Sequence, residues 1–484
     1  MSVFLKNTLK LSSAPVITQI LSFFALPIIT RIYDPDHFGT FNLIASVAGV
    51  FSVFCGLGYH QAIVLPKKDN DALDLLKISF LITFLLSIVV FIFLSFIPLK
   101  YYENYEMQDI YAYIWTIPLL IFFHGLYVTL LGWNIRKTNY GVIAFSRVMN
   151  VLSNKSYIIL IGIISVASAT ALILGTLIGS IIMSLLLFFW SFSEIKVIFK
   201  NNLSNIKILL LRYKQFPIYN VGNDLVYRAK QALIIIVLTY FFSSSIAGHY
   251  GMALLILAIP TTLIGSSISE VFYQKISNNS STNQIKSISL RLFKFLCFGL
   301  FFSYAFLSFY SHKILPFFLG EKWLDTGMII SILSLFCFIE FIFTPCHSIL
   351  KVKNKQQYLF IYQLSIIIFS LLSLVIGGIF NSYLISFILF SLSNSIISIF
   401  LGVYTFKLIK IEPINIFKVL LKTILYSIPP TFIVFIIDNF FELNIFNIIL
   451  LGFISIFMNL SIILKFEIEF FNDFKLLLPK SKFF

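Results

Sequence analysis

The sequence predicts an all-α membrane protein with about fourteen transmembrane helices. The chain of 484 residues is 59% hydrophobic and only 11% charged, with a mean hydropathy of +0.96. That composition excludes water-soluble classes of this length. The apolar residues gather in runs of about twenty, enough for a helix to cross a bilayer core of ~30 Å. The runs lack the ten-residue alternating pattern of membrane β-barrels, so the spans are expected to be helices.

Hydropathy along the chain places each span. We expect the helices near 12–32, 40–65, 76–98, 110–133, 140–164, 168–192, 216–241, 248–272, 292–311, 327–349, 358–378, 383–406, 419–437 and 445–464. The first run has a weak basic leader and many spans follow it, so it is expected to stay as a signal anchor. The longest connections, near 193–215 and 273–291, are too short to hold a soluble domain.

The basic residues alternate between the two sides of this arrangement. Of 35 Lys and Arg residues, 27 lie in the N-terminal segment, in every second connection or in the C-terminal tail, and four lie on the opposite side. The positive-inside rule therefore predicts that both termini are cytoplasmic. The cations are dispersed over short loops without aromatic interleaving, so the formal charge of +15 indicates contact with anionic membrane lipids and no nucleic-acid binding.

A weak internal repeat divides the chain into two halves. Tyr33 and Gly39 follow the first span, and Tyr240 and Gly248 follow the seventh at similar spacing. Two parallel six-helix bundles of this kind are typical of transporters that rock around a central site. Chance similarity between apolar helices is the alternative. The predicted parts are an N-terminal bundle at 1–195, a cytoplasmic linker at 196–215, a C-terminal bundle at 216–406, and an additional two-helix hairpin with a cytoplasmic tail at 407–484.

Three motifs carry a resemblance to a known family. They are Arg31-Ile-Tyr-Asp-Pro-Asp-His-Phe-Gly39, the run from Ile259 to Lys275, and Leu319-Gly-Glu-Lys-Trp323. In order and spacing they resemble the O-antigen (Wzx-type) flippases of the multidrug/oligosaccharidyl-lipid/polysaccharide exporter superfamily. The resemblance covers the first 406 residues, and the last two spans are similar in position to those of lipid II flippases.

That resemblance implies a function and partners. It implies translocation of an undecaprenyl-pyrophosphate-linked oligosaccharide, such as an O-antigen repeat unit for lipopolysaccharide, from the cytoplasmic to the periplasmic leaflet of a bacterial inner membrane. The implied partners are this lipid-linked substrate, a polysaccharide polymerase and a chain-length regulator; no cofactor is implied beyond a coupling proton or sodium ion. Many family members carry an acid in the seventh span where this chain has Lys230, and the nearest acid is Asp224.

Ionisable residues at membrane depth are costly, so they usually face a bundle interior or a wet cavity. The fifth span places Arg147, Asn150 and Asn154 on one stripe, with Lys155 beside it. The seventh span has a polar face at helical spacing, with cations on its flanks. Its members are Asn220, Asn223, Asp224, Tyr227, Arg228, Lys230 and Gln231.

These residues are the candidates for substrate binding. Cations would offset the phosphate charge, and amide or hydroxyl groups would replace water around the sugar. The pyrophosphate candidates are Arg31, Arg147, Lys155, Arg228 and Lys230. The glycan candidates are Asn150, Asn154, Asn220, Asn223, Tyr227 and Gln231.

Simpler interpretations stay open for several of these side chains. Arg147 and Lys155 could snorkel to the headgroups, and Asp224 could form an ion pair with Arg228. Asp224 and Glu340, in the middle of the tenth span, are the candidates for ion coupling. For Glu340 the alternative is a hydrogen-bonded buried carboxyl.

These residues bear on three possible functions, a flippase, an antiporter and a polymerase. A flippase that makes or breaks no bond fits the cationic spans best. A small-molecule or drug antiporter of the same superfamily is expected to have an acidic site, whereas basic residues outnumber acids here. A membrane-embedded polysaccharide polymerase is expected to place acids, Arg or His in a large periplasmic loop, which this chain lacks. We therefore expect no enzymatic activity.

Overall fold

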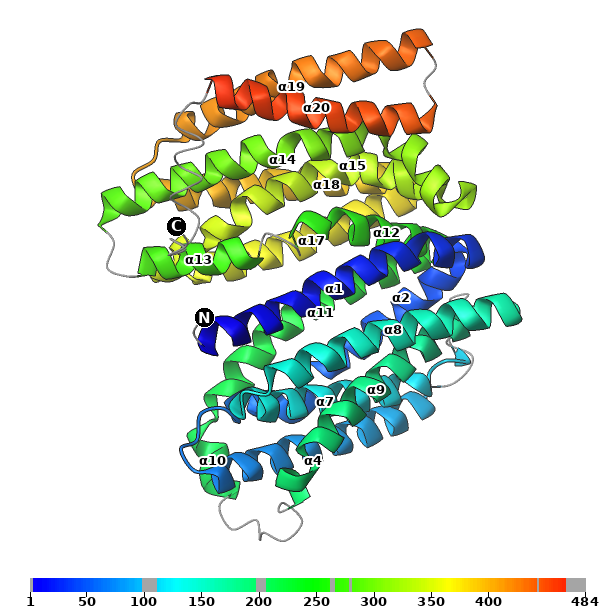
Figure 1. Cartoon of the computed structure of the whole chain (residues 1–484), viewed down its shortest axis with the longest axis vertical. Helices are drawn as coiled ribbons and strands as arrows, with labels where there is room; N and C mark the ends of the chain where they lie inside the picture. The colour runs from blue at the N-terminus through cyan, green and yellow to red at the C-terminus, as the bar shows by residue number, and fades with distance from the viewer. Residues whose placement is uncertain are drawn as a thin grey trace. The chain divides into compact units, whose positions relative to one another are not determined.

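The computed structural model describes residues 3–97, 111–196, 206–261, 266–277, 281–441 and 444–466. Throughout these ranges every regular element is a helix (Figure 1), which confirms the all-α prediction. Contacts group the chain into two compact units, Met1–Gly251 and Met252–Phe484. The predicted boundary at 196–215 concerns the sequence repeat and stays a prediction.

The helices of the first unit form one connected set of contacts. Its helix α8 contacts both α1 and α9, while α7 contacts α4, α9 and α2, and α11 packs against α2. Asp34 begins α2 with a capping box to His37, and Pro35 occupies the first turn, where a missing N–H costs nothing. The elements are α1 (Val3–Ile32), α2 (Pro35–Ser52), η1 (Cys55–Gly58), α3 (Tyr59–Ala62), α4 (Asp69–Ser95), α7 (Thr116–Arg136), α8 (Tyr140–Ile164), α9 (Ala169–Ile195), α10 (Ile206–Arg212), η3 (Phe216–Asn220), α11 (Val221–Phe241) and the start of α12 (Ser244–Leu257).

The second unit is built around the contacts of α14 with α15 and of α17 with α18. The C-terminal pair α19 and α20 packs on α14, where Tyr310 and Ile314 meet Val434 and Ile448 in an apolar cluster. The elements are α13 (Ser266–Ser277), α14 (Thr282–Leu319), η5 (Glu321–Trp323), α15 (Leu324–Phe343), η6 (Thr344–His347), α16 (Ser348–Val352), α17 (Gln357–Ile379), α18 (Tyr383–Lys407), α19 (Pro413–Phe441) and α20 (Ile445–Phe466).

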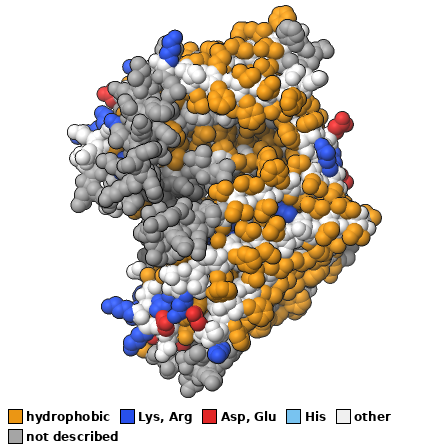
Figure 2. Space-filling view, viewed as in Figure 1, with side chains coloured by type: hydrophobic (Ala, Val, Ile, Leu, Met, Phe, Trp, Pro, Cys, Tyr) orange, Lys and Arg blue, Asp and Glu red, His pale blue; other side chains and the backbone are white. Residues whose placement is uncertain are grey.

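The surface of the helices is apolar enough for lipid. Eleven of the described helices are long and hydrophobic enough to cross a membrane, and the bent pair of α2 with η1 and α3 makes a twelfth. Large side chains such as Phe24, Phe189, Phe400 and Phe457 are about 70% exposed. Figure 2 shows hydrophobic side chains gathered over the right-hand part of the visible face. These features agree with a polytopic membrane protein.

Several expected spans differ from simple helices. The eighth, expected at 248–272, is described as the separate helices α12 and α13, and the tenth, expected at 327–349, contains the 3-10 segment η6. The second breaks at Gly56, Leu57 and Gly58, all with positive φ, and continues as the short helix α3 after a bend of 50°. The ninth was expected at 292–311, but α14 extends over 38 residues. Its early start is fixed by a capping box between Ser281 and Gln284, which hydropathy does not detect.

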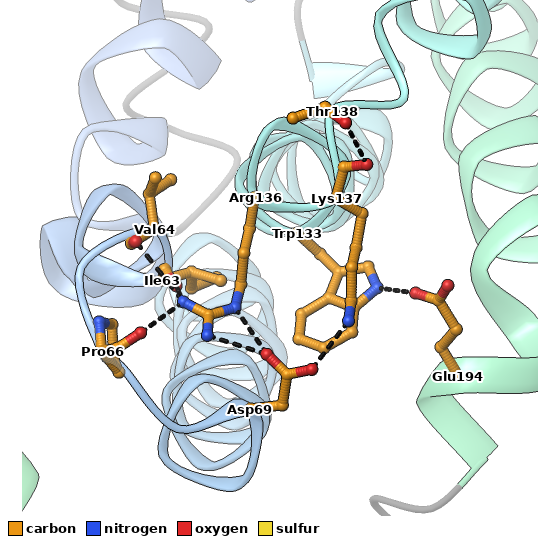
Figure 3. Close-up of polar contacts among 9 residues, drawn as sticks. All are labelled: Ile63, Val64, Pro66, Asp69, Trp133, Arg136, Lys137, Thr138 and Glu194. Carbon is orange, nitrogen blue, oxygen red and sulfur yellow. Dashed lines mark hydrogen bonds and ion pairs between the residues drawn. The ribbon is translucent and has the colours of Figure 1, made fainter.

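Polar contacts join residues that the charge pattern assigns to the same side. Figure 3 shows the end of the first unit that is predicted to be cytoplasmic, where Asp69 accepts from Arg136 and Lys137 at 2.8 Å each. Arg136 also donates to the carbonyl of Pro66 at 2.6 Å, and Trp133 donates to Glu194 at 2.9 Å. In the second unit, Lys313 and Asp438 of the other side pair at 2.6 Å. The pairings agree with the predicted order of spans.

Candidate substrate-binding site

Two intramembrane arginines of the first unit interact with neighbouring residues of α7. Arg147 of α8 donates through Nε to the hydroxyl of Tyr127 at 3.1 Å. Arg228 of α11 lies within electrostatic range of His124, which precedes Tyr127 by one helical turn. A Cβ placed on Gly49 of α2 would lie 3.9 Å from Cδ of Arg228, so this glycine leaves room for the arginine. Two cations that are 81 residues apart in sequence thus act on residues three positions apart on α7.

The intramembrane cations have no acidic partner among the described side chains. Arg147, Lys155, Arg228 and Lys230 form no ion pair there. The alternative of an ion pair between Asp224 and Arg228 is not observed, and both side chains are exposed. Uncompensated cations at membrane depth are costly, so they favour an anionic ligand.

The polar face of α11 contains a local cluster around Tyr227. Gln231 donates from Nε2 to the Tyr227 hydroxyl at 3.2 Å, and the Lys230 ammonium lies 5.7 Å from the centre of the Tyr227 ring. Tyr227 itself is 49% exposed. The side chains of Asn220 and Asn223 lie outside the described part of the chain. The described members form a surface of hydroxyl, amide and ammonium groups, the chemistry expected for a glycan and a phosphate.

Asn150 and Asn154 face the neighbouring helix α9. Asn154 donates from Nδ2 to Thr176 at 3.2 Å, while its buried Oδ1 has no described partner. A Cβ on Gly179 would lie 3.1 Å from Nδ2 of Asn150 and 3.2 Å from Cβ of Asn154. Small residues of α9 therefore allow close helix packing at these amides. Their assignment to glycan binding stays a prediction.

The remaining pyrophosphate candidates lie farther from this turn of α7. Helices α1 and α8 contact at Gly162, where an added Cβ would lie 2.5 Å from Ile32. Arg31 is thus level with Gly162, fifteen residues from Arg147 along α8, or about 22 Å at 1.5 Å per residue. Lys155 lies eight residues from Arg147, about 12 Å along the same axis. Arg31 is not brought together with the arginines.

Glu340 belongs to the second unit and is half-buried. Tyr304 of α14, Cys337 of α15 and Tyr362 of α17 lie within electrostatic range of its carboxylate. No hydrogen bond from a described residue reaches that carboxylate. The other predicted coupling residue, Asp224, is in the first unit, so the two do not form one cluster within a unit.

Within the described ranges, no three or more His, Cys, Asp or Glu residues are grouped so that they could hold a metal ion.

Tyr127, His124 and Gly49 were not among the predicted site residues. His124 is a polar residue within a membrane span, and no described side chain or backbone group forms a hydrogen bond with it. The spacing of His124 and Tyr127, three residues apart in an otherwise apolar span, is the signal that could have found them. Which arginine approaches them depends on tertiary packing.

Comparison with known proteins places this architecture in a family. Residues 28–328, more than half of the chain, match the family described as Polysaccharide biosynthesis protein. The chain belongs to this family. The match within this polysaccharide biosynthesis family includes the Arg31–Gly39 motif and the turn of α7 with its two arginines. No curated protein matches the sequence.

Two solved structures share the fold of this polysaccharide biosynthesis protein. A lipid II flippase, MurJ, in an inward closed conformation superposes with a TM-score of 0.72 at 19% identity, covering 95% of this chain and 99% of that one. An inward-facing multidrug resistance transporter of the MATE family and MOP superfamily gives a TM-score of 0.65 at 13% identity, covering 83% and 98%. The family match agrees with the resemblance of the sequence motifs, and the two structures show that the fold is shared.

Proposed function

We propose that this protein is a flippase that moves an undecaprenyl-pyrophosphate-linked oligosaccharide from the cytoplasmic to the periplasmic leaflet of a bacterial inner membrane. The observation that carries the proposal is the set of intramembrane cations without a described acidic partner, of which Arg147 bonds to Tyr127 and Arg228 lies within electrostatic range of His124 on the same helix. A pyrophosphate is the anion that a lipid-linked oligosaccharide presents. Membership of the polysaccharide biosynthesis family supports the same substrate class.

The chemistry of the site suggests how such a substrate is held. An arginine guanidinium donates two parallel hydrogen bonds to phosphate oxygens. It therefore suits a pyrophosphate better than the single charge of a lysine ammonium does. The Tyr227 and Gln231 side chains of α11 present hydroxyl and amide groups for sugar hydroxyls. The polyprenyl tail stays in lipid while the headgroup crosses by alternating access, and no bond is made or broken.

Coupling to an ion is part of the proposal. Asp224 and Glu340 are the predicted coupling residues, and Glu340 has the more enclosed surroundings, with Tyr304 and Tyr362 nearby. A proton or a sodium ion at such a carboxylate would give the substrate cycle a driving force. O-antigen is the proposed glycan, and a polymerase and a chain-length regulator are the proposed downstream partners.

Deleting the gene and locating the lipid-linked oligosaccharide tests the function. We expect the oligosaccharide to accumulate on the cytoplasmic leaflet, where a membrane-impermeant glycan-oxidising reagent reaches it in inverted vesicles but not in spheroplasts. Unpolymerised units exposed on spheroplasts would instead indicate a polymerase. Unchanged surface glycan combined with altered drug tolerance would support the antiporter.

Complementation of the deletion tests the site. We expect the double variant Arg147→Ala with Lys155→Ala to restore little surface glycan, because two cations of the proposed phosphate site are lost. Lys68→Ala is the matched control, since Lys68 is an exposed cation outside the spans. Full activity of the double variant, at equal protein level, would remove both residues from the site.

A further inference from the structure

A group of buried polar atoms in the first unit lacks hydrogen-bond partners. The hydroxyls of Ser79 and Thr129 have none, although both residues are at most 1% exposed, and Nδ1 of His60 has none either. The buried Thr83 hydroxyl has the Cys55 thiol, a weak partner, beside it. Other buried hydroxyls, such as that of Ser87, donate to the carbonyl one turn earlier. Buried polar groups are almost always satisfied by protein or by ordered water. These atoms therefore indicate a hydrated spot inside the unit.

The broken second span brings these groups together. A Cβ on Gly56, at the break, would lie 3.4 Å from the Ser79 hydroxyl. One on Gly125 of α7 would lie 2.8 Å from the Thr83 hydroxyl and 2.9 Å from the Cys55 sulfur. On the following helix α3, the carbonyl of His60 approaches Gly132, where an added Cβ would lie 2.5 Å away. Three glycines thus allow η1, α3, α4 and α7 to meet around the polar atoms.

His124 is at the inner end of this hydrated group. It precedes Gly125 on α7 and lies within electrostatic range of both His60 and Arg228. Counting from Arg136 at the end of α7, Thr129 lies about 10 Å and His124 about 18 Å along the axis. The unpartnered groups therefore extend from the end predicted to be cytoplasmic toward the arginines of the candidate site.

Few other charges face His124. Arg147 of α8 reaches Tyr127 one turn away. The charged residues of α4 are Asp69, Asp71, Asp74 and Lys77 in its first turns, and that of α9 is Glu194, which accepts from Trp133 near the helix end. Helix α2 has Asp36 and His37 in its first turn only, and the thiol of η1 is Cys55. Arg228, which shares α11 with Asp224 and Lys230, is thus the charge that acts on this imidazole, and it repels a second positive charge.

We propose that His124, with His60 behind it, is a proton-binding site whose occupancy is linked to phosphate binding at Arg228. An anion at Arg228 offsets the charge that opposes protonation of His124, so the proton and the anionic headgroup bind cooperatively. The hydrated hydroxyls of Ser79, Thr83 and Thr129 give the proton a path from the cytoplasmic end. This inference rests on the proposed function, because it requires a phosphate ligand at Arg228.

Proton uptake on binding tests this link. The full-length protein in weakly buffered nanodiscs receives undecaprenyl pyrophosphate near pH 6, and a pH indicator reports the protons taken up. We expect the wild type to take up about one proton more per bound lipid than His124→Gln, because the linked imidazole supplies the difference. The protonation of the lipid itself is common to all variants and cancels. Arg228→Gln is expected to weaken binding and to remove the extra uptake.

Histidine NMR of the wild type provides a second measurement that does not depend on a variant's folding. At fixed pH, the ¹⁵N signals of His124 should move from the neutral to the protonated form when the lipid is added. For the uptake measurement, His312→Gln is the matched control, since His312 is an exposed histidine of the second unit. The proton uptake of this variant should equal that of the wild type.

The outcomes separate this inference from the proposed function. Binding of the lipid with equal uptake by wild type and His124→Gln, or with unchanged His124 signals, would overturn the proton site and leave the flippase proposal standing. Failure of the wild type to bind the lipid at all would overturn the proposed function, and the linked proton site with it.

Discussion

At the scale of single residues, the first unit contains two kinds of cation, those whose charge is compensated by other residues and those whose charge is not. Arg136 donates to backbone carbonyls and to Asp69, so its charge is compensated within the protein. Arg147 has one described hydrogen bond, to a neutral tyrosine, and Arg228 has none. A compensated cation stabilises a fold, whereas an uncompensated one at membrane depth is retained for a ligand.

Arg147→Ala should weaken binding of undecaprenyl pyrophosphate roughly 10- to 100-fold, because a charge-assisted hydrogen bond contributes about 1.5–3 kcal/mol. Tyr127→Phe should weaken it only a few-fold, since the arginine loses its positioning partner but keeps its charge. Binding to the purified protein in nanodiscs measures both. Equal affinities for wild type and Arg147→Ala would place the phosphate elsewhere.

Arg136→Ala should destabilise the protein by about 2 kcal/mol or more, because the removal of a buried donor leaves carbonyl groups unsatisfied. Lys137→Ala is the control, since Lys137 is more exposed and its ion pair with Asp69 contributes at most about 1 kcal/mol. Thermal unfolding in detergent, followed by size-exclusion fluorescence, compares the two. A melting temperature for Arg136→Ala that equals the control would exclude this stabilising role.

At the scale of elements, glycines decide which helices approach closely. Gly39 of α2 packs against the backbone of Ser244, where an added Cβ would overlap the carbonyl oxygen, and Gly248 of α12 packs against the carbonyl of Pro35 in the same way. These are the corresponding glycines of the two predicted repeats. Sequence comparison aligned them, and the fold places them in contact within the first unit.

Gly248→Ala should destabilise the contact between α2 and α12 by about 1–3 kcal/mol, as overpacking against backbone usually does. Gly222→Ala is the matched control, because nothing lies within 4 Å of its added Cβ, and alanine in a helix is favoured over glycine by up to about 1 kcal/mol. Opposite shifts in melting temperature are expected. A Gly248→Ala protein as stable as the wild type would show that α2 and α12 can move apart without lowering the free energy of unfolding.

At the scale of the whole molecule, the side on which each loop lies is still a prediction. Glu321 and Gln356 are exposed and lie on opposite sides of the predicted tenth span. We expect a membrane-impermeant maleimide to label Glu321→Cys in spheroplasts and to label Gln356→Cys only after permeabilisation, because the positive-inside rule places the basic connections in the cytoplasm. The four native cysteines are free and mostly buried, so the unmodified protein provides the background control. The reverse labelling would invert the orientation.

The sequence by itself determined the all-α class, the approximate positions of the spans and the family, because hydropathy and ordered motifs are properties of neighbouring residues. It also identified Arg147 and Arg228 as cations that lie within the spans and not in the loops, since the free-energy cost of a charge at membrane depth can be recognised without knowing how the helices pack. Only the tertiary structure decided that Arg147 bonds to Tyr127, that Arg228 lies within electrostatic range of His124 and that Asn150 faces α9, whereas Arg31 is too far away. Those outcomes depend on which helices pack together, and apolar helix faces in lipid do not specify their neighbours from composition alone.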